Sequence, residues 1–219
     1  PPFRGEGGVW ETEYDPENFH YGRFTRDPAG FWDDRVDLHE TLFGDDPEPN
    51  AAHEAIAGLE SAGVVDAVVT QNTDGLHTAA GSDRVLELHG NARRTVCQRC
   101  GERHDADAAR AAATRGDLPP TCDCGGTLKP DVVLFGEQLP RETLRDAREL
   151  AARADVFVAA GSSLQVEPAA SLPREAAREG TLAVVNLDAT EQDRLADYRF
   201  RADVTEVLPA LADAVVERL

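Results

Sequence analysis

The chain has 219 residues and is strongly acidic, with 41 Asp and Glu against 22 Lys and Arg and a formal net charge of −19. This charge repels phosphate backbones and anionic lipids, so we do not expect nucleic-acid or membrane binding as the main activity. No run approaches the roughly 20 apolar residues that span a bilayer and no secretory leader is recognisable, so we expect a cytoplasmic protein.

The predicted elements alternate between helices and short apolar strands along most of the chain. The first helix is capped by Asn50, runs through Leu59 and ends near Gly63, and a strand follows at residues 64–70. The later elements are a helix at 140–154, a buried strand at 155–160, a helix at 168–179, a strand at 182–187 and a final helix at 205–219. This alternation predicts an α/β fold with a Rossmann-type, mainly parallel sheet covered on both faces. Ligands of such sheets bind at the carboxyl ends of the strands.

Two stretches interrupt the alternation. Residues 91–128 are rich in Cys, Gly, Arg and Pro and have little periodicity, which indicates an inserted module. Residues 13–49 are rich in Asp, Pro, Gly and aromatic residues, and we expect a mobile loop there, followed by a short helical region around 31–42.

The cysteine spacing is the strongest local signal. Cys97 and Cys100 form one close pair, and after 21 residues Cys122 and Cys124 form a second. Four thiolates in two such pairs can surround one tetrahedral zinc ion, and a site with no open position would be structural. Two disulfides are the alternative, which the expected intracellular location disfavours. A nucleic-acid-binding zinc ribbon is a weaker alternative, because aspartates in the module offset its arginines.

Two further segments carry polar groups that suit chemistry. Asn72 and Asp74 follow the predicted strand at 64–70, where an amide and a carboxylate can hold the ribose and amide groups of a nucleotide. They could equally satisfy a turn. His89 ends a half-buried strand and precedes Gly90, a residue that allows close approach. A lone histidine is usually structural, but its unperturbed pKa suits general-base catalysis near neutral pH.

These segments occur in the order and spacing of the sirtuin family, which the chain resembles along nearly its whole length. The matching blocks are residues 3–10 (FRGEGGVW), 70–77 (TQNTDGLH), 87–90 (ELHG), the paired cysteines, 133–140 (VLFGEQLP) and 161–170 (GSSLQVEPAA). Six ordered matches are improbable by chance. They favour functional over structural roles for His89, Asn72 and Asp74.

The resemblance implies an NAD-dependent protein-lysine deacetylase acting on acetylated proteins. It implies a large Rossmann-type NAD-binding domain formed by residues 1–90 and 129–219, and a zinc-binding module at 91–128 that is joined by the loop region at about 13–49. In sirtuins the acetyl oxygen attacks the ribose carbon that nicotinamide leaves, giving an alkylimidate. His89 would take a proton from a ribose hydroxyl, which lets that oxygen close on the imidate carbon. The products are deacetylated lysine, nicotinamide and O-acetyl-ADP-ribose.

The resemblance also assigns NAD contacts by position. Asn72 and Asp74 would hold the nicotinamide amide and ribose, and Gln71 the neighbouring ribose hydroxyl. Phe3 would shield the reacting ribose face, with Arg4 on the phosphate or ribose side. Gly161, Ser162 and Ser163 are expected to open a helix whose N–H groups suit pyrophosphate or ribose oxygens. The adenosine end would be lined by Asn186 and Val204. An ordinary helix cap or strand end is the alternative for Ser162, Ser163 and Asn186.

The expected substrate contacts lie in one short segment, namely Val133, Phe135, Gly136 and Glu137. The resemblance implies that residues 133–137 pair with the substrate backbone as an added strand, an interaction that tolerates varied peptide sequences. Val133 and Phe135 would flank the acetyl-lysine tunnel. Core packing is the alternative for these two side chains.

The chain departs from the family pattern at three places. The glycine-rich segment and first strand that precede Phe3 in the family are absent from these 219 residues, and we expect poor NAD binding without them. Thr73 stands where the family usually has isoleucine. The Tyr-x-x-Arg pair of desuccinylating sirtuins is replaced by Arg35 and Leu38, so we expect acetyl or another neutral acyl group as substrate.

The sequence is compatible with two other functions. A protein mono-ADP-ribosyltransferase would use the same NAD site, and an inactive zinc-stabilised scaffold would need none of the catalytic residues. The acidic, lysine-poor composition is also typical of proteins from salt-loving archaea, where high ionic strength screens self-repulsion. We therefore expect a halophilic protein.

Overall fold

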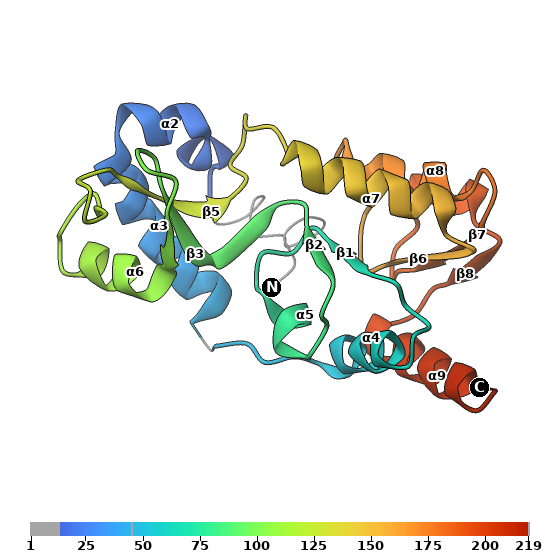
Figure 1. The fold of residues 1–219 in the computed structure, drawn as a ribbon. Helices are drawn as coiled ribbons and strands as arrows, with labels where there is room; N and C mark the ends of the chain where they lie inside the picture. Colours follow the sequence, from blue (N-terminus) through green and yellow to red (C-terminus); the bar gives the residue numbers. More distant parts are fainter. Residues whose placement is uncertain (1–13, 45, 219) are drawn as a thin grey trace. The chain divides into compact units, whose positions relative to one another are not determined.

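The computed structural model describes residues 14–44 and 46–218, which form two compact units (Figure 1). The first unit contains Asn72–Gly75, His89–Leu139 and the described part of Pro1–Pro47. The second contains Glu48–Gln71, Leu76–Leu88 and the described part of Pro140–Leu219. Phe3 and Arg4, and with them the sequence block at 3–10, lie outside the described residues.

The second unit is built on parallel strands. Strands β6 (Val156–Ala160), β7 (Thr181–Val185) and β8 (Tyr198–Phe200) form a parallel sheet in that order. A second parallel pair joins β1 (Val68–Thr70) to β2 (Val85–Glu87). The α/β fold class predicted from the alternating pattern is confirmed.

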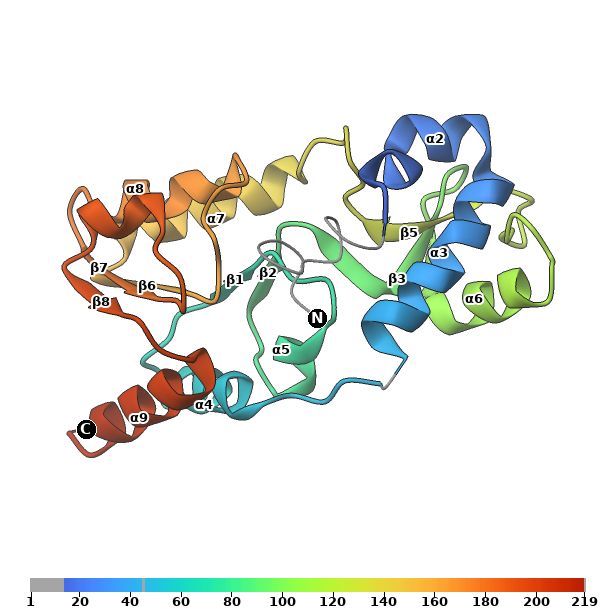
Figure 2. The same ribbon diagram turned by 180° about the vertical axis from the view of Figure 1, so that it is seen from behind.

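Helices lie along both sides of the β6–β8 strands (Figures 1 and 2). Helices α7 (Arg141–Arg153) and α8 (Leu172–Ala176) run along one side, and α4 (Ala51–Ser61) and α9 (Val204–Val216) along the other. Leu182 and Val184 of β7 pack in one apolar cluster, whereas Val185 packs with Ala52 of α4 and Leu208 of α9. Strand β7 is therefore buried on both faces, as expected for the centre of such a sheet.

Most element predictions for this unit are confirmed with small shifts of boundary. The side-chain oxygen of Asn50 accepts hydrogen bonds from the backbone N–H groups of Ala52 (3.0 Å) and His53 (3.2 Å), so it caps α4 as predicted. Strand β1 is shorter than the apolar run that predicted it. The buried strand predicted at 155–160 is only partly right, since Val156 and Val158 of β6 are 61% and 38% exposed. These two side chains share one face of the strand, and no described residue covers that face fully.

The helix predicted at residues 168–179 is wrong in part. The structure has a short 3-10 helix η2 (Ala169–Ser171) followed by the five-residue α8. Residues 177–179 lie outside a helix because Ala177 ends α8 and the chain turns at Gly180 towards β7. Two short elements complete this unit, α5 (Leu76–Ala79) and η3 (Glu191–Leu195).

The first unit combines helices with a small antiparallel sheet. Its helices are η1 (Pro16–Phe19), α2 (Tyr21–Arg26), α3 (Pro28–Phe43) and α6 (Ala106–Thr114). Its strands β3 (Gly90–Cys97), β4 (Arg103–Asp105) and β5 (Leu128–Val132) form a sheet in the order β4-β3-β5.

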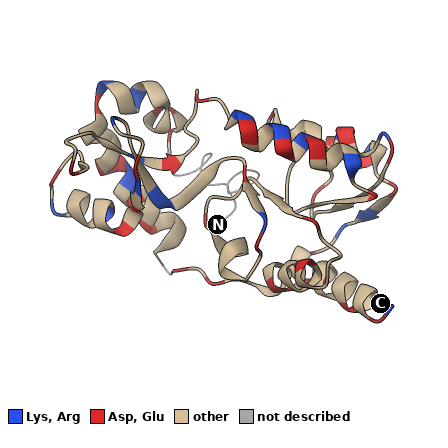
Figure 3. Ribbon diagram, in the orientation of Figure 1, with Lys and Arg blue, Asp and Glu red and all other residues tan. Residues whose placement is uncertain are grey.

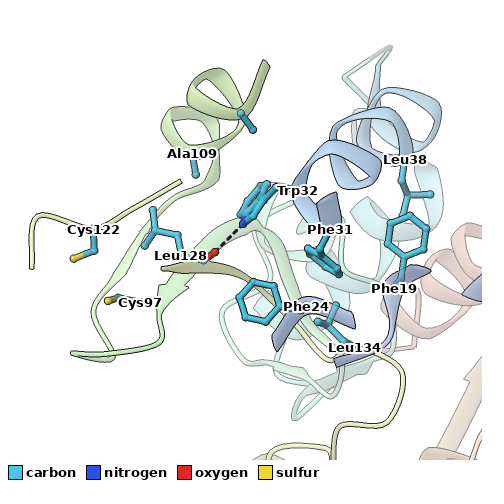
Figure 4. Packing of buried hydrophobic residues seen from close by; sticks show 11 residues of the cluster. Phe19, Phe24, Phe31, Trp32, Leu38, Cys97, Ala109, Cys122, Leu128 and Leu134 are labelled. Atoms are coloured by element: carbon cyan, nitrogen blue, oxygen red, sulfur yellow. Dashed lines mark hydrogen bonds between the residues drawn. The ribbon is translucent and has the colours of Figure 1, made fainter. Parts of the chain in front are cut away.

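An aromatic cluster explains why the region at 13–49 is more helical than predicted. Phe19, Phe24, Phe31 and Trp32 are each at most 4% exposed and pack together in one core (Figure 4). The indole N–H of Trp32 donates to the carbonyl oxygen of Leu128 at 2.8 Å, which ties α3 to β5. The prediction of a loop over residues 21–26 is wrong, because burial of the aromatic side chains stabilises helices that local composition does not favour.

Charged residues of both signs lie on exposed elements (Figure 3). They alternate along α7, where Arg145 pairs with the neighbouring Asp146 at 2.9 Å. Exposed pairs of this kind contribute little to stability, and salt screens them. Among the described residues, none of the helices is long and apolar enough to span a membrane.

Candidate active site

The four cysteines come together in the first unit. Their Sγ atoms lie within 4.8 Å of one another, the Cys97–Cys124 pair at 3.4 Å and the Cys100–Cys122 pair at 3.8 Å. None of the four is in a disulfide. Four sulfur donors at such distances fit one tetrahedral soft-metal site, and zinc is the usual ion for this donor set.

The backbone around Cys97 favours a thiolate at this cysteine. The N–H groups of Cys100 (3.5 Å) and Arg99 (3.4 Å) donate to Sγ of Cys97, and these hydrogen bonds lower the pKa of the Cys97 thiol to about 6. At Cys122 a backbone hydrogen bond from Cys124 lowers the pKa, but burial and the neighbouring cysteine side chains outweigh it and raise the pKa to about 12. A Cβ atom at Gly126 would lie only 2.5 Å from Sγ of Cys97, so this position has no room for a side chain. The residues present therefore fit a metal-bound thiolate cluster rather than two disulfides.

A second group of predicted site residues gathers at strand ends of the second unit. Gln71, Gly161 and Asn186 come directly after β1, β6 and β7. The side-chain amide of Gln71 donates to Oγ of Ser162 at 3.4 Å, and the N–H of Gly161 donates to the carbonyl of Val185 at 2.9 Å. A Cβ atom at Gly161 would lie 3.6 Å from Val204, which places this last NAD-contact candidate beside the same turn.

The strand-end turn differs from the prediction in one respect. Gly161, Ser162 and Ser163 do not open a helix, since the next helical residue is Ala169. Leu164 has a φ of 53°, which is incompatible with a right-handed helix, and Oγ of Ser162 accepts from the N–H of Leu164 at 3.2 Å. A helix dipole is therefore not available to a phosphate at this turn. Any contribution to ligand binding has to come from local backbone N–H groups and the two hydroxyls.

Asn72 and Asp74 belong to a short loop that is fastened to β3 in the first unit. The N–H of Ala92 donates to the carbonyl of Thr73 at 2.7 Å, and Nε of Arg93 donates to the carbonyl of Asp74 at 2.7 Å. Gly75 has a φ of 75°, and its Cα lies so close to Asn91 and Arg93 that a Cβ would be 3.1–3.3 Å from their side chains. The start of β3 therefore fixes the backbone of the loop.

His89 precedes the same end of β3. Its carbonyl oxygen accepts a hydrogen bond from the N–H of Val133 at 2.9 Å. Gly90 has a φ of 74°, and a Cβ there would lie only 2.0 Å from the carbonyl oxygen of Asp131. The close approach that the sequence predicted at Gly90 is thus an approach to β5. It brings the half-buried His89, the Asn72–Gly75 loop and the start of the predicted substrate segment onto one small sheet.

The backbone of residues 133–137 is partly used inside the protein. Phe135 donates its N–H to Phe19 (3.3 Å) and accepts from Tyr21 (2.9 Å), while Leu134 and Glu137 bond each other. The Phe135 side chain packs against the aromatic core. Gly136 has a φ of 82°, and a Cβ there would overlap the ring of His20. A bound peptide strand would therefore have to pair with the carbonyl of Val133 and with Gly136, rather than with the whole segment.

Several polar contacts of the site were not anticipated from the sequence. Arg93 holds the Asp74 loop, and the buried Lys129 forms an ion pair with the half-buried Glu137 at 2.9 Å. The sequence did contain a signal for the Lys129–Glu137 pair, because Lys129 is the only lysine in the 219 residues. Arg35 and Leu38, which replace the Tyr-x-x-Arg pair, are both buried on α3.

Two features together indicate the class of this protein. One unit is a parallel α/β unit with polar residues at its strand ends, and the other contains the four cysteines and His89. This combination is typical of nucleotide-dependent enzymes that carry a structural metal module. The model of the Sir2 family matches residues 1–168, and the chain belongs to this family.

Relatives of known identity agree with this assignment. The chain is 57% identical to the "NAD-dependent protein deacetylase" of Haloarcula marismortui over all of this chain and 84% of that protein. A solved structure described as "Sir2-p53 peptide-NAD+" has 35% identity and a TM-score of 0.81, covering 100% of this chain and 86% of the other. A Sir2 variant solved with a deacetylated p53 peptide and 3′-O-acetyl ADP ribose has 35% identity and a TM-score of 0.85, over 100% and 86% of the two chains.

Proposed function

We propose that the protein is an NAD-dependent protein-lysine deacylase that removes acetyl or another neutral acyl group. The observation that carries the proposal is the arrangement around β3, where the Asn72–Gly75 loop, His89 and Val133 are fixed by backbone hydrogen bonds of 2.7–2.9 Å. A general base, an amide and a carboxylate held on one rigid element suit a reaction that depends on orientation. Family membership and the relatives named above support the same reaction.

The roles follow from the chemistry of each group. His89 takes the proton of a ribose hydroxyl, and that oxygen then attacks the carbon of the captured acyl group. Asn72 and Asp74 hold the nicotinamide and ribose end of NAD, with Phe3 shielding the ribose and Arg4 beside it. At the strand ends of the second unit, the ribose and phosphate contacts come from Gln71, Gly161, Ser162 and Ser163, and the adenosine contacts from Asn186 and Val204. NAD supplies the electrophilic ribose carbon and is consumed.

The metal has a structural role in this proposal. Cys97, Cys100, Cys122 and Cys124 would hold one zinc ion, and no fifth protein donor or open face is needed. The acetylated substrate would lie along Val133, Phe135, Gly136 and Glu137. The same segment hydrogen-bonds to His89 through Val133.

The proposed setting is a salt-rich cytoplasm. The net charge of −19 and the 57% identity to a Haloarcula protein support a halophilic protein. Assays are therefore designed at high salt, where the self-repulsion of the acidic surface is screened.

Product analysis tests the reaction type. A peptide with an isotope-labelled acetyl group is incubated with NAD, and the label is followed by mass spectrometry. Deacylation predicts that the label moves to ADP-ribose in equal amount to the nicotinamide released. Transfer of ADP-ribose to protein with the acetyl group still on lysine would replace the proposal by a mono-ADP-ribosyltransferase, and a folded, zinc-bound protein that releases no nicotinamide would support the scaffold. The chain is compared with a version extended at its N-terminus by the glycine-rich segment that the family resemblance implies.

A further inference from the structure

The only lysine of the 219 residues is buried beneath the predicted substrate segment. Lys129 lies on β5 and is 7% exposed. Its Nζ atom donates to the carbonyl oxygen of Val132 at 2.7 Å and to Oε2 of Glu137 at 2.9 Å. In a chain with 22 basic residues, 21 of them arginine (22 − 1), the single lysine therefore occupies an interior position where a compact cation has two defined partners.

The partner carboxylate closes the segment into a turn. Oε2 of Glu137 also accepts the N–H of Leu134 at 2.8 Å, and the N–H of Glu137 donates to the carbonyl of Leu134 at 3.0 Å. Lys129 thus bonds to Val132, which precedes the segment, and to Glu137, which is its last residue. One charged group fixes the path of the four residues between Val132 and Glu137.

The orientation of two backbone groups depends on this turn. Phe135 and Leu134 already use their N–H and carbonyl groups within the protein, and the N–H of Val133 donates to His89. Among the described residues of this segment, the groups left for a peptide are therefore the carbonyl of Val133 and the backbone of Gly136. Both residues lie between the two anchor points of Lys129. The Glu137 side chain, which the family resemblance places beside the substrate, accepts hydrogen bonds from Lys129 and from the N–H of Leu134.

We propose that Lys129 is a positioning residue for substrate binding, which acts by holding Glu137 so that the backbone of Val133 and Gly136 is ready to pair with the acetylated peptide. This inference rests on the proposed function. Lys129 touches neither the peptide nor NAD, and its effect is confined to the peptide side of the reaction. The NAD contacts at the strand ends of the second unit involve no residue of this turn.

Three variants test this role, with Arg145→Met as the matched control. Lys129→Met removes the cation, Glu137→Gln removes the anion, and Lys129→Arg keeps the charge. The control removes a cation from the exposed Arg145–Asp146 pair on α7. We expect the Kd and KM for an acetylated peptide to rise about tenfold in Lys129→Met and Glu137→Gln, the scale of one lost hydrogen bond. The KM for NAD stays within about twofold, Lys129→Arg recovers part of the loss, and Arg145→Met resembles the wild type.

The single lysine also gives a readout that is independent of activity. With lysine labelled with ¹⁵N at Nζ, Lys129 gives the only labelled ammonium signal of the 219 residues. We expect its protons to exchange slowly in the wild type and fast in Glu137→Gln. An unchanged Kd for the peptide in folded, zinc-bound Lys129→Met would overturn the positioning role of Lys129. Equal losses of affinity for peptide and NAD would also overturn it, since they indicate general damage to the protein. A wild-type protein that binds no acetylated peptide would contradict the proposed function as well, whereas a variant with normal peptide binding in an active enzyme contradicts only the role of Lys129.

Discussion

Substitution of Gly90 by alanine should damage the protein at the junction of β3 and β5. With a φ of 74°, an alanine here incurs the left-handed backbone cost of about 1 kcal/mol. Its Cβ would also lie 2.0 Å from the backbone oxygen of Asp131, so the two strands must move apart by about 1.4 Å to reach ordinary contact distance. That movement breaks the Val133–His89 hydrogen bond, which contributes on the order of 1 kcal/mol, and adds packing strain of similar size.

The expected total loss is about 3 kcal/mol or more, which for a chain of this size lowers Tm by roughly 6–12 °C. Gly116→Ala is the matched control in the same unit, because Gly116 also has a left-handed φ, 87°, but nothing lies within 4 Å of an added Cβ. It should lose only about 1 kcal/mol, or roughly 2–4 °C. Calorimetry at high salt measures both. A Gly90→Ala protein no less stable than Gly116→Ala, with unchanged deacylation, would refute the close approach of the two strands and its role in fixing His89.

Two further predictions concern the metal site and pH. The wild type should hold about one zinc per chain. Cys97→Ser should lose most of that metal and the thermal transition of the first unit, because a cysteine-only site contributes folding free energy directly. Elemental analysis and calorimetry check this, and a zinc-free wild type with an unchanged transition would contradict it. Burial lowers the pKa of His39 to about 4, assisted by Arg110, Arg35 and Arg93 against the opposing Asp107. Since the unfolded chain then binds more protons than the folded one between pH 6.5 and 4, stability from this group is complete above pH 6.5 and is lost as pH falls towards 4. The unfolding free energy of His39→Gln should therefore fall less over that range than that of the wild type, and equal slopes in denaturant titrations would contradict the assignment.

The sequence predicted those features that depend on local pattern. Asn50 predicts the start of α4, because an N-cap side chain bonds to backbone groups within the next few residues. The spacing of Cys97, Cys100, Cys122 and Cys124 predicts a metal site, because it reflects the geometry of one metal ion. The apolar runs located β6 and β7 for the same reason, since their period is set by the strand itself.

Features that depend on contacts between distant segments were missed. The helix α2 exists because Phe24 packs with Phe31, and that packing has no local signature. Gly161–Ser163 do not begin a helix because Leu164 has a left-handed backbone conformation. No residue type in that turn predicts such a conformation at a leucine. The ion pair of Lys129 with Glu137 joins residues eight positions apart across a turn. The composition showed that the lysine is unusual, but it did not predict which residue pairs with it.

The most direct test of the catalytic assignment is NAD-dependent deacylation by His89→Ala. The assay uses an acetyl-lysine peptide at high salt, on the version extended by the glycine-rich segment, and follows deacetylated peptide and O-acetyl-ADP-ribose together. His104→Ala serves as the matched control, because His104 is a half-buried histidine of β4 with no proposed part in the reaction. We expect His89→Ala to remain folded and zinc-bound but to lose deacylation by at least about 100-fold, the usual contribution of a general base, while His104→Ala stays active. Deacylation by His89→Ala at the rate of the His104→Ala control would contradict the catalytic assignment.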